Sequence, residues 1–444
     1  NDLRFDFLAS LTLAGAAVAA LSACSTLTPT VQQADRATAN AVARVDVSGK
    51  SSTVLGFIPT GWYPTAARVL SDQSVMVLNG RGSRSFPNPE GPNPTIRKAP
   101  VHEGIVAVQY VGAIQNGSAS LIPPPTAETM GTYTENVMKY SPYKGTANTA
   151  GPTNLPPIEH VIYVVKENRT YDQVLGDLGI GNGDPSLTLF TEQIAPNHHK
   201  LAREFVLLDN FYVNADVSAD GHNWSTSAIA PPYVQRMWPN SYASRRRHYD
   251  YEGGERAALP PAGYVWSNAL QKGLSVRNYG WWCTNITPAP ASGEQILKVR
   301  DASLEPHTNK LYRGFDLDYK DIDRMQVFLK DLAGFEATGK MPSLITMRIG
   351  NDHTSGTAAG KISPQSAMAD NDQALGMLVE AVSKSKFWGT TAIFVLEDDA
   401  QNGPDHVDSH RSPAYVISPY TRGRGIDSTM YNTVSMLRTI EVIL

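Results

Sequence analysis

The distribution of apolar residues changes near residue 157 and gives the chain two differently built parts. After that point, near-continuous apolar runs predict buried strands at 158–165, 204–213, 343–349, 391–397 and 413–420. Apolar residues at helical spacing predict helices over 320–333, 368–386 and 429–444. Because such strands alternate with helices, we expect an α/β domain whose mostly parallel sheet is covered on both faces.

The part before residue 158 has shorter apolar runs, separated by Gly, Asn and Pro. Runs at 42–49, 54–64 and 74–82 predict a small β-rich module. These runs resemble one to two blades of a bacterial YVTN-type β-propeller, and a β appendage of another kind fits them equally well. Proline, glycine and asparagine dominate 141–157, which we interpret as a linker. The predicted organisation is therefore 1–40 as a leading segment, 41–140 as the partial propeller module, and 158–444 as the main domain.

The leading segment contains an apolar run of small residues at 8–21, followed by Leu-Ser-Ala-Cys24. The run is too short for a membrane span and is typical of a signal peptide that ends in a lipobox. Asp2 and Asp6 stand where a positive region is expected, so a buried helix is the alternative. On the first interpretation the protein is exported to the periplasm or cell surface, with membrane anchoring through a lipidated Cys24. Since the sequence starts at Asn1 and stops in an apolar run, we expect a longer natural chain.

Composition narrows the protein class but not the function. The 444 residues carry 38 Lys and Arg against 42 Asp and Glu, a net charge of −4, and 18% of residues are charged. Such values exclude disordered, coiled-coil and collagen-like chains, and they give no signature of nucleic-acid binding. Two cysteines cannot form a disulfide framework.

Residue types that can bind a metal ion or take part in catalysis gather where the predicted strands end. The clusters are Lys166-Glu167-Asn168-Arg169, 214–223 with Ser218 and His222, Asn351-Asp352-His353, and Glu397-Asp398-Asp399 with His406 and His410 downstream. Open α/β sheets bind ligands at the carboxyl ends of their strands, so we expect these clusters to meet.

The acidic triplet 397–399 points to a cation, because adjacent carboxylates at the end of a buried strand repel one another. Carboxylates, an amide and imidazoles suit a divalent ion such as Zn, Mn or Ca. Ser218, four residues before His222, is the best nucleophile candidate, because a serine hydroxyl needs activation of this kind. No HExxH, Walker A, dinucleotide or GxSxG motif is present in the sequence.

Some of these residues also have purely structural interpretations. Glu167-Asn168 and Asp352-His353 could serve as turns or helix caps, and His198-His199 could be solvated. Trp281 and Trp282 could line a substrate pocket or belong to an aromatic core.

Five segments together resemble the bacterial phosphoesterase family of phospholipase C-like and acid-phosphatase-like enzymes in the alkaline phosphatase superfamily. They are KENRTYDQVLGD (166–177), ADVSADGHNWS (215–225), NDHTSG (351–356), MADNDQALG (368–376) and EDDAQNGPDHVDSHRSP (397–413). The resemblance covers about 158–444 and implies an alkaline-phosphatase-like α/β/α sandwich. Some members of the family carry a β-propeller before it.

Carried over by position, the resemblance assigns roles to individual residues. A metal pair falls on Glu167 and Asn168, the serine nucleophile on Ser218, and a late acidic metal pair on Glu397 and Asp398, with the part of Asp399 left open. Further metal or phosphate ligands fall on Asp352, His353, His406 and His410, while His353 or His222 would protonate the leaving group. Candidate substrate contacts are Asn223, His199 and Trp282.

The resemblance implies a metal-dependent phosphoric ester hydrolase that works through a phosphoserine intermediate on Ser218. Two alternatives stay open. One keeps the site but changes the ester to a sulfate or phosphonate. The other is a catalytically inert surface binding protein.

Overall fold

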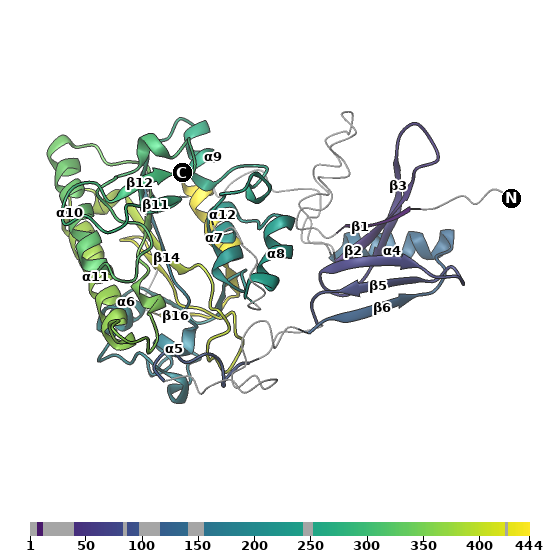
Figure 1. Cartoon of the computed structure of the whole chain (residues 1–444), viewed down its shortest axis with the longest axis horizontal. Coiled ribbons are helices and arrows are strands. Elements are labelled where there is room, and N and C mark those ends of the chain that lie inside the picture. The colour runs from purple at the N-terminus through teal and green to yellow at the C-terminus, as the bar shows by residue number, and fades with distance from the viewer. Residues whose placement is uncertain are drawn as a thin grey trace. The chain divides into compact units, whose positions relative to one another are not determined.

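A computed structural model describes residues 7–11, 40–82, 87–96, 116–140, 155–242, 252–421 and 425–444. The chain forms two compact units (Figure 1). The smaller one comprises Asn1–Ser85 with Ile114–Gly151, and the larger one comprises Phe86–Ala113 with Pro152–Leu444.

The smaller unit contains two three-stranded antiparallel sheets and one helix among its described residues. The first sheet is β1 (Phe7–Leu11), β2 (Ala41–Asp46) and β3 (Thr53–Pro59), and the second is β4 (Pro64–Val69), β5 (Val75–Asn79) and β6 (Ser118–Ile122). Helix α4 (Ala127–Tyr140) contributes Met130 to a small core with Val42, Ile58 and Val77. The propeller interpretation of these strands stays a prediction.

The predicted export signal falls largely on residues that the structure does not describe. Residues 12–39, with Cys24, lie outside the described ranges, so export and lipidation also stay predictions. Within the described ranges, no helix is both long and apolar enough to span a bilayer.

The larger unit is built on a five-stranded sheet of order β10-β13-β7-β14-β15. Its strands are β10 (Val276–Tyr279), β13 (Leu344–Arg348), β7 (His160–Lys166), β14 (Thr391–Glu397) and β15 (Ala414–Ile417). All neighbours are parallel except β14 and β15, which are antiparallel. The mostly parallel sheet expected from the apolar runs is confirmed.

One predicted strand is wrong. The run 204–213 is divided by a turn at Asp209-Asn210 into β8 (Val206–Leu208) and β9 (Phe211–Tyr212). These short strands pair outside the main sheet, with β16 (Gly425–Asp427) and β17 (Tyr431–Asn432). The polar pair at the turn interrupts an otherwise apolar run, which is typical of a chain reversal.

Helices cover both faces of the sheet, as Figure 1 shows for α10 and α11 on one side and α12 on the other. Ile162 and Val164 of β7 face a core shared with α6 (Pro196–Glu204), α10 (Asp321–Thr338) and α11 (Pro364–Lys384). Val161, Tyr163 and Val165 face the opposite core, with α9 (Val265–Gln271) and α12 (Thr433–Ile443). Successive residues of β7 thus point to opposite faces, and helices bury both faces. The domain is therefore an α/β/α sandwich. The remaining elements are α5 (Tyr171–Leu175), α7 (Ser218–Ser227), α8 (Pro232–Tyr242), β11 (Cys283–Asn285) and β12 (Ile296–Val299).

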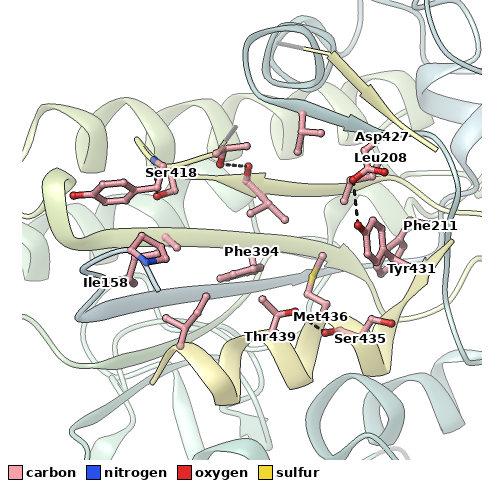
Figure 2. Close-up of a pocket in the computed structure, with 17 residues that line it drawn as sticks. Ile158, Leu208, Phe211, Phe394, Ser418, Asp427, Tyr431, Ser435, Met436 and Thr439 are labelled. Carbon is pink, nitrogen blue, oxygen red and sulfur yellow. Dashed lines mark hydrogen bonds between the residues drawn. The ribbon is translucent and has the colours of Figure 1, made fainter. Parts of the chain in front are cut away.

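An apolar pocket of about 370 Å³ lies against α12 and the β14–β15 side of the sheet (Figure 2). Phe394, Phe211 and Met436 line it, and Asp427 is the one acidic residue among its lining side chains, where it accepts a hydrogen bond from Tyr431 (3.1 Å). Ala392 and Phe394 belong to the first part of β14. The acidic residues predicted to bind a metal ion lie at the other end of that strand. The pocket and the predicted metal site are therefore in different places.

Candidate functional site

Three neighbouring strands of the sheet deliver polar side chains to one edge. The strands β13, β7 and β14 are adjacent and parallel, so their carboxyl ends lie side by side. Three segments begin with the last residue of a strand: Lys166–Arg169 at β7, Arg348–Asp352 at β13 and Glu397–Asp399 at β14. The sequence expectation that these clusters meet at one edge agrees with this arrangement.

Helix α7 brings Ser218 to the same edge. The helix begins at Ser218, and the Asp220 carboxylate accepts a hydrogen bond from the Val217 backbone nitrogen (3.1 Å) just before it. Gly221 faces the acidic strand end so closely that a Cβ there would lie 2.7 Å from the Asp398 carbonyl oxygen. The absence of a side chain at Gly221 is therefore what allows the first turn of α7 to pack against Asp398.

Asn168, Ser218, Asp398 and Asp399 form a group that we call the Ser218 cluster. One end of the Asn168 amide lies 3.1 Å from Ser218 Oγ and 3.2 Å from Asp398 Oδ1, and its other end lies 3.0 Å from His353 Nε2. Ser218 Oγ also lies 3.5 Å from Asp399 Oδ1. Asn168 has a φ of +62°, an uncommon conformation that asparagine tolerates better than most residues.

The Ser218 cluster is buried, and its Asp399 carboxyl group has no ion-pair partner among the described residues. The Oδ2 atom of Asp399 is buried without a hydrogen-bond partner in the described part of the chain. Burial, with the neighbouring Asp398 and Glu167 carboxylates, raises the pKa of Asp399 well above its ordinary value.

The charge balance of this edge fits a divalent cation. Residues 166–169, 348–352 and 397–399 contribute five carboxylates but only three cations, which leaves two negative charges when His222 is neutral and one when it is protonated. The Asn168 amide can take two orientations, and its hydrogen bonds with the described residues are satisfied when its nitrogen faces the acids. With its oxygen toward Ser218, Asp398 and Asp399, four oxygens converge as they do around a bound ion. With its nitrogen there instead, the amide would donate to them.

Beside this cluster, His222 has three carboxylates within 3.5 Å of its ring nitrogens, those of Glu167, Asp398 and Glu252. Its Nε2 atom is 3.4 Å from Glu167 Oε1 and 3.3 Å from Asp398 Oδ2, and these three residues have the spacing of a metal-ligand set. Arg348 contacts the same group through its hydrogen bond to Glu167 Oε1 (Nε, 2.9 Å). Burial and Arg348 oppose protonation of His222, but Asp398 and Glu167 outweigh them and raise its pKa to about 9. Burial would raise the pKa of Glu167, yet Arg348 and His222 lower it to about 2.

Glu397 faces away from the Ser218 cluster and into a buried ion triad. Lys166 Nζ lies 2.9 Å from both Glu397 Oε1 and Asp352 Oδ2. The late acidic pair at the cluster is therefore Asp398 and Asp399, one residue later than the pair expected from the resemblance. Asp352 also accepts from the Glu167 backbone nitrogen (3.2 Å), so it joins β7 to β13.

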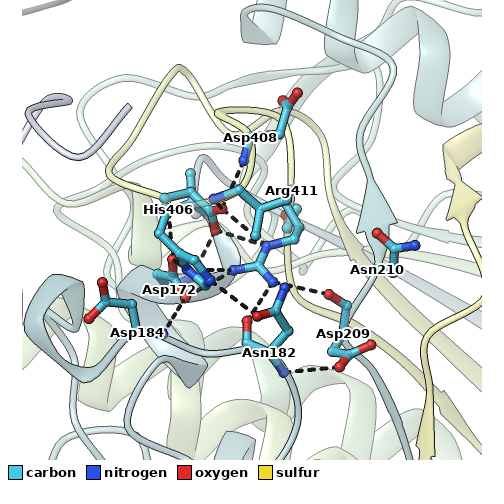
Figure 3. A network of polar contacts seen from close by, with 12 residues as sticks. Asp172, Asn182, Asp184, Asp209, Asn210, His406, Asp408 and Arg411 are labelled. Carbon is cyan, nitrogen blue, oxygen red and sulfur yellow. Dashed lines mark hydrogen bonds and ion pairs between the residues drawn. The ribbon is translucent and has the colours of Figure 1, made fainter. Parts of the chain in front are cut away.

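His406 lies in a second group, the Arg411 network of Asp172, Asp405, His406 and Arg411 (Figure 3). Arg411 is at its centre and donates to Asp172 Oδ1 (3.0 Å) and Asp405 Oδ1 (3.1 Å). His406 Nδ1 is 2.6 Å from Asp172 Oδ2. Burial raises the pKa of Asp405 to about 6, against the opposing effect of Arg411.

The other candidates are placed as follows. His410 pairs with Asp216 (3.1 Å) and Asp408 (3.0 Å), and these bonds overcome burial to raise its pKa to about 10. His199, on α6, pairs with Asp177 (2.7 Å). Asn223 donates to Ala219 O (3.3 Å) within α7. Trp282 is buried, with its ring centroid 6.5 Å from that of His222. Among the described residues, none of these four forms a hydrogen bond or ion pair with the Ser218 cluster.

Sequence reasoning missed the buried cations of the edge. Arg348 was in none of the predicted clusters, and Lys166 and Arg169 were named in one without a role. Each is buried and contacts a candidate residue or its backbone. A signal was available for Arg348, since it is the one charged residue in the apolar run 343–349. A cation in such a run needs a buried acid as its partner.

Comparison with solved structures gives relatives at low identity. A protein of the alkaline phosphatase superfamily from Vibrio parahaemolyticus is 16% identical over 66% of this chain and 68% of its own, with a TM-score of 0.43. The lipoteichoic acid synthase LtaP from Listeria monocytogenes is 12% identical over 66% and 75%, with a TM-score of 0.42. The PsFucS1 sulfatase from Pseudoalteromonas sp. is 10% identical over 64% and 67%, with a TM-score of 0.44. No curated protein sequence matches the chain.

The sequence itself carries the family assignment. Residues 180–444 match the phosphoesterase family, which is more than half of the chain and includes Ser218, His222, Asp398 and Asp399. The chain therefore belongs to the phosphoesterase family and is an ester-hydrolysing enzyme.

Proposed function

We propose that this enzyme is a metal-dependent phosphoric ester hydrolase whose nucleophile is Ser218. A divalent ion would be held by Asn168, Ser218, Asp398 and Asp399. The observation that carries the proposal is the convergence of the Ser218 hydroxyl with an amide and two carboxylates, one of which has no cationic partner in the described chain.

The bound ion would lower the pKa of the serine hydroxyl and neutralise charge on the phosphoryl oxygens. The residues of the chain orient the serine nucleophile and the phosphoryl group. Ser218 is fixed at the start of α7, where the backbone nitrogens of the first turn and the helix dipole favour a negatively charged phosphoryl group. Asp399 Oδ1, 3.5 Å from Ser218 Oγ, is the carboxylate acceptor within hydrogen-bond reach of the serine proton.

Attack of Ser218 Oγ on phosphorus would form a phosphoserine and release the alcohol, and water would then hydrolyse the phosphoserine. The leaving oxygen needs a proton. His353 lies next to Asn168 and is only partly buried, whereas His222 is enclosed by Glu167, Asp398 and Arg348. This difference favours His353 as the proton donor.

The proposal is tested with purified protein on chromogenic phosphomonoester and phosphodiester substrates, with added metals and with EDTA. We expect turnover that EDTA abolishes and that divalent ions restore. A phosphate label on Ser218, trapped by acid quench and located by mass spectrometry, would identify the nucleophile. Equal turnover with and without EDTA would contradict the proposal.

The same assay separates the alternatives that share this site. Rates on matched sulfate and phosphate esters compare the two esters directly, and a phosphonate ester serves as the third substrate. If the sulfate ester reacts faster, the ester class assigned here is wrong although the site is right. An inert binding protein would turn over none of the three.

A further inference from the structure

The backbone next to His353 has an unusual conformation. Thr354 has a φ of +61° and a ψ of 164°, a region of backbone space that is occupied almost only by glycine. For a β-branched residue this conformation is a strained outlier. Thr354 is buried, and its backbone nitrogen donates to the Asn351 carbonyl oxygen (3.0 Å). The strain must be offset by contacts that hold this loop, residues 350–354, in place.

Arg169 supplies two of these contacts. Its Nε atom donates to the Asp352 carbonyl oxygen (2.8 Å), and its Nη2 atom donates to the His353 carbonyl oxygen (2.8 Å). The guanidinium is buried and lies over the Phe190 ring, with its carbon 5.4 Å from the ring centroid. A planar group with a rigid fork of donors can hold two successive carbonyls in one orientation while it stacks on a ring.

The conformation of Thr354 places its carbonyl against the His353 ring. His353 Nδ1 lies 2.8 Å from the Thr354 carbonyl oxygen. Because a carbonyl only accepts, Nδ1 carries a proton, and Nε2 is the nitrogen that can exchange one. Nε2 faces Asn168 of the Ser218 cluster, and the Phe315 ring meets the imidazole edge-on, with centroids 5.7 Å apart. The strained backbone therefore fixes which nitrogen faces the site.

We propose that Arg169 is a positioning residue that holds the strained Thr354 backbone and thereby keeps His353 Nε2 directed at the leaving oxygen. This inference rests on the proposed function, in which His353 is the proton donor. As the bond between phosphorus and the leaving oxygen breaks, that oxygen takes the Nε2 proton, while Nδ1 keeps its own proton on the Thr354 carbonyl. Water returns a proton to Nε2 when it hydrolyses the phosphoserine. Without Arg169, Thr354 would relax out of the strained region and carry its carbonyl away from the ring.

The experiment varies the leaving group of the substrate. The leaving oxygen of an alkyl phosphate ester needs a proton, whereas that of a dinitrophenyl ester hardly does. We expect Arg169→Met to lower kcat by about 10²-fold on the alkyl ester and by less than about 3-fold on the dinitrophenyl ester. The control is Arg277→Met. Arg277 also lies over an aromatic ring (Tyr279, 5.8 Å) and pairs with an acid (Asp331, 2.8 Å), but no hydrogen bond of its side chain among the described residues reaches 350–354. It should change both rates by the same factor.

Two double variants test the route from Arg169 to the proton. Adding Thr354→Gly to Arg169→Met should recover about 10-fold in kcat on the alkyl ester, because glycine adopts this conformation without strain. Adding Arg169→Met to His353→Gln should cost little more on the alkyl ester, because the group that Arg169 positions is already absent.

Equal losses on the two esters in Arg169→Met, no loss on either, no recovery with Thr354→Gly, or additive losses with His353→Gln would each overturn the inference. If Arg169→Met does not fold, Arg169→Lys takes its place under the same criteria, since it keeps the charge but not the planar fork. A His353→Gln variant that loses as much on the dinitrophenyl ester as on the alkyl ester would instead contradict the proposed proton donor, on which the inference rests.

Discussion

The Ser218 cluster and the Arg411 network use the same kinds of residue, but only the second contains its own cation. Both contain two buried aspartates and a nearby, partly buried histidine. In the network, Arg411 donates to both Asp172 and Asp405. In the cluster, Asp399 has no cationic partner in the described chain, and the serine hydroxyl faces the acids. We infer that the first is built to receive an ion and the second to hold the fold together.

This difference teaches that a count of acids and histidines does not identify a metal site. Asp172, Asp405 and His406 offer three ligand atoms as close together as those of Glu167, His222 and Asp398. In both groups an arginine lies among the acids, and its position determines which carboxylate oxygens are left to bind an ion. The following predictions test this distinction, from the largest expected effect to the smallest.

Replacing the nucleophile should have the largest effect. We expect Ser218→Ala to lower kcat by about 10³-fold or more, because metal and binding alone would remain. The matched control is Ser227→Ala, which removes a hydroxyl of the same helix that only donates to the Asn223 and Ile229 carbonyl oxygens. Steady-state rates of both variants are compared. Similar rates for the two would exclude Ser218 as nucleophile.

Asp399→Asn and Asp405→Asn remove one charge from each region. We expect Asp399→Asn to weaken divalent-ion binding by about 10²-fold or more, because it removes a charged ligand of the ion. Asp405→Asn should leave ion affinity unchanged, since Arg411 already neutralises that acid. Titration calorimetry with Mn²⁺ measures both affinities. A stronger loss of ion binding in Asp405→Asn would reverse the assignment of the two regions.

Removing the central arginine of the network should affect stability instead of chemistry. Arg411→Met leaves Asp172 and Asp405 buried without their cation, and the expected loss in free energy of unfolding is about 3–5 kcal/mol. Arg438→Met, which removes an exposed arginine of α12, should change the free energy of unfolding very little. Denaturant unfolding of both variants gives the comparison. If Arg411→Met were as stable as the parent, the network would not hold the fold.

A substitution at Gly221 changes the distance between α7 and the acids without replacing any of the proposed metal ligands. In Gly221→Ala the new Cβ would lie 2.7 Å from the Asp398 carbonyl oxygen, so the helix must shift. We expect kcat to fall by about 10-fold to 100-fold, because a misplacement of about 1 Å is costly in an active site. Gly334→Ala in α10 has open space around its Cβ and should instead stabilise the protein slightly. Unchanged kcat in Gly221→Ala would show that the contact between α7 and Asp398 is unimportant.

The buried strands could be predicted because their sequences are continuous apolar runs. β7, β13 and β14 agree with 158–165, 343–349 and 391–397 to within two residues. β10 was missed because its sequence, Val-Arg-Asn-Tyr, is short and half polar, as an edge strand of the sheet can be. The order of the strands is set by contacts between distant segments, which periodicity does not encode.

The candidate site could be predicted as a set of clusters but not as a set of contacts. Because parallel strands have their carboxyl ends at the same edge of a sheet, the clusters at the ends of β7, β13 and β14 lie together. Which acid faces the serine depends on the register after β14, where Glu397 pairs with Lys166 and Asp399 approaches Ser218. His406 follows the same acidic segment, yet it pairs with Asp172, because Arg411 organises that loop. Partners such as these are tertiary, so no local pattern reveals them.

The most direct test of the account is anomalous scattering from crystals of the enzyme loaded with Mn²⁺ or Zn²⁺. We predict one strong peak per chain, within coordination distance of Asn168, Ser218, Asp398 and Asp399, and no peak among Asp172, Asp405 and His406. A peak in the Arg411 network, or none at the Ser218 cluster, would contradict the claim that the uncompensated cluster is the reacting site.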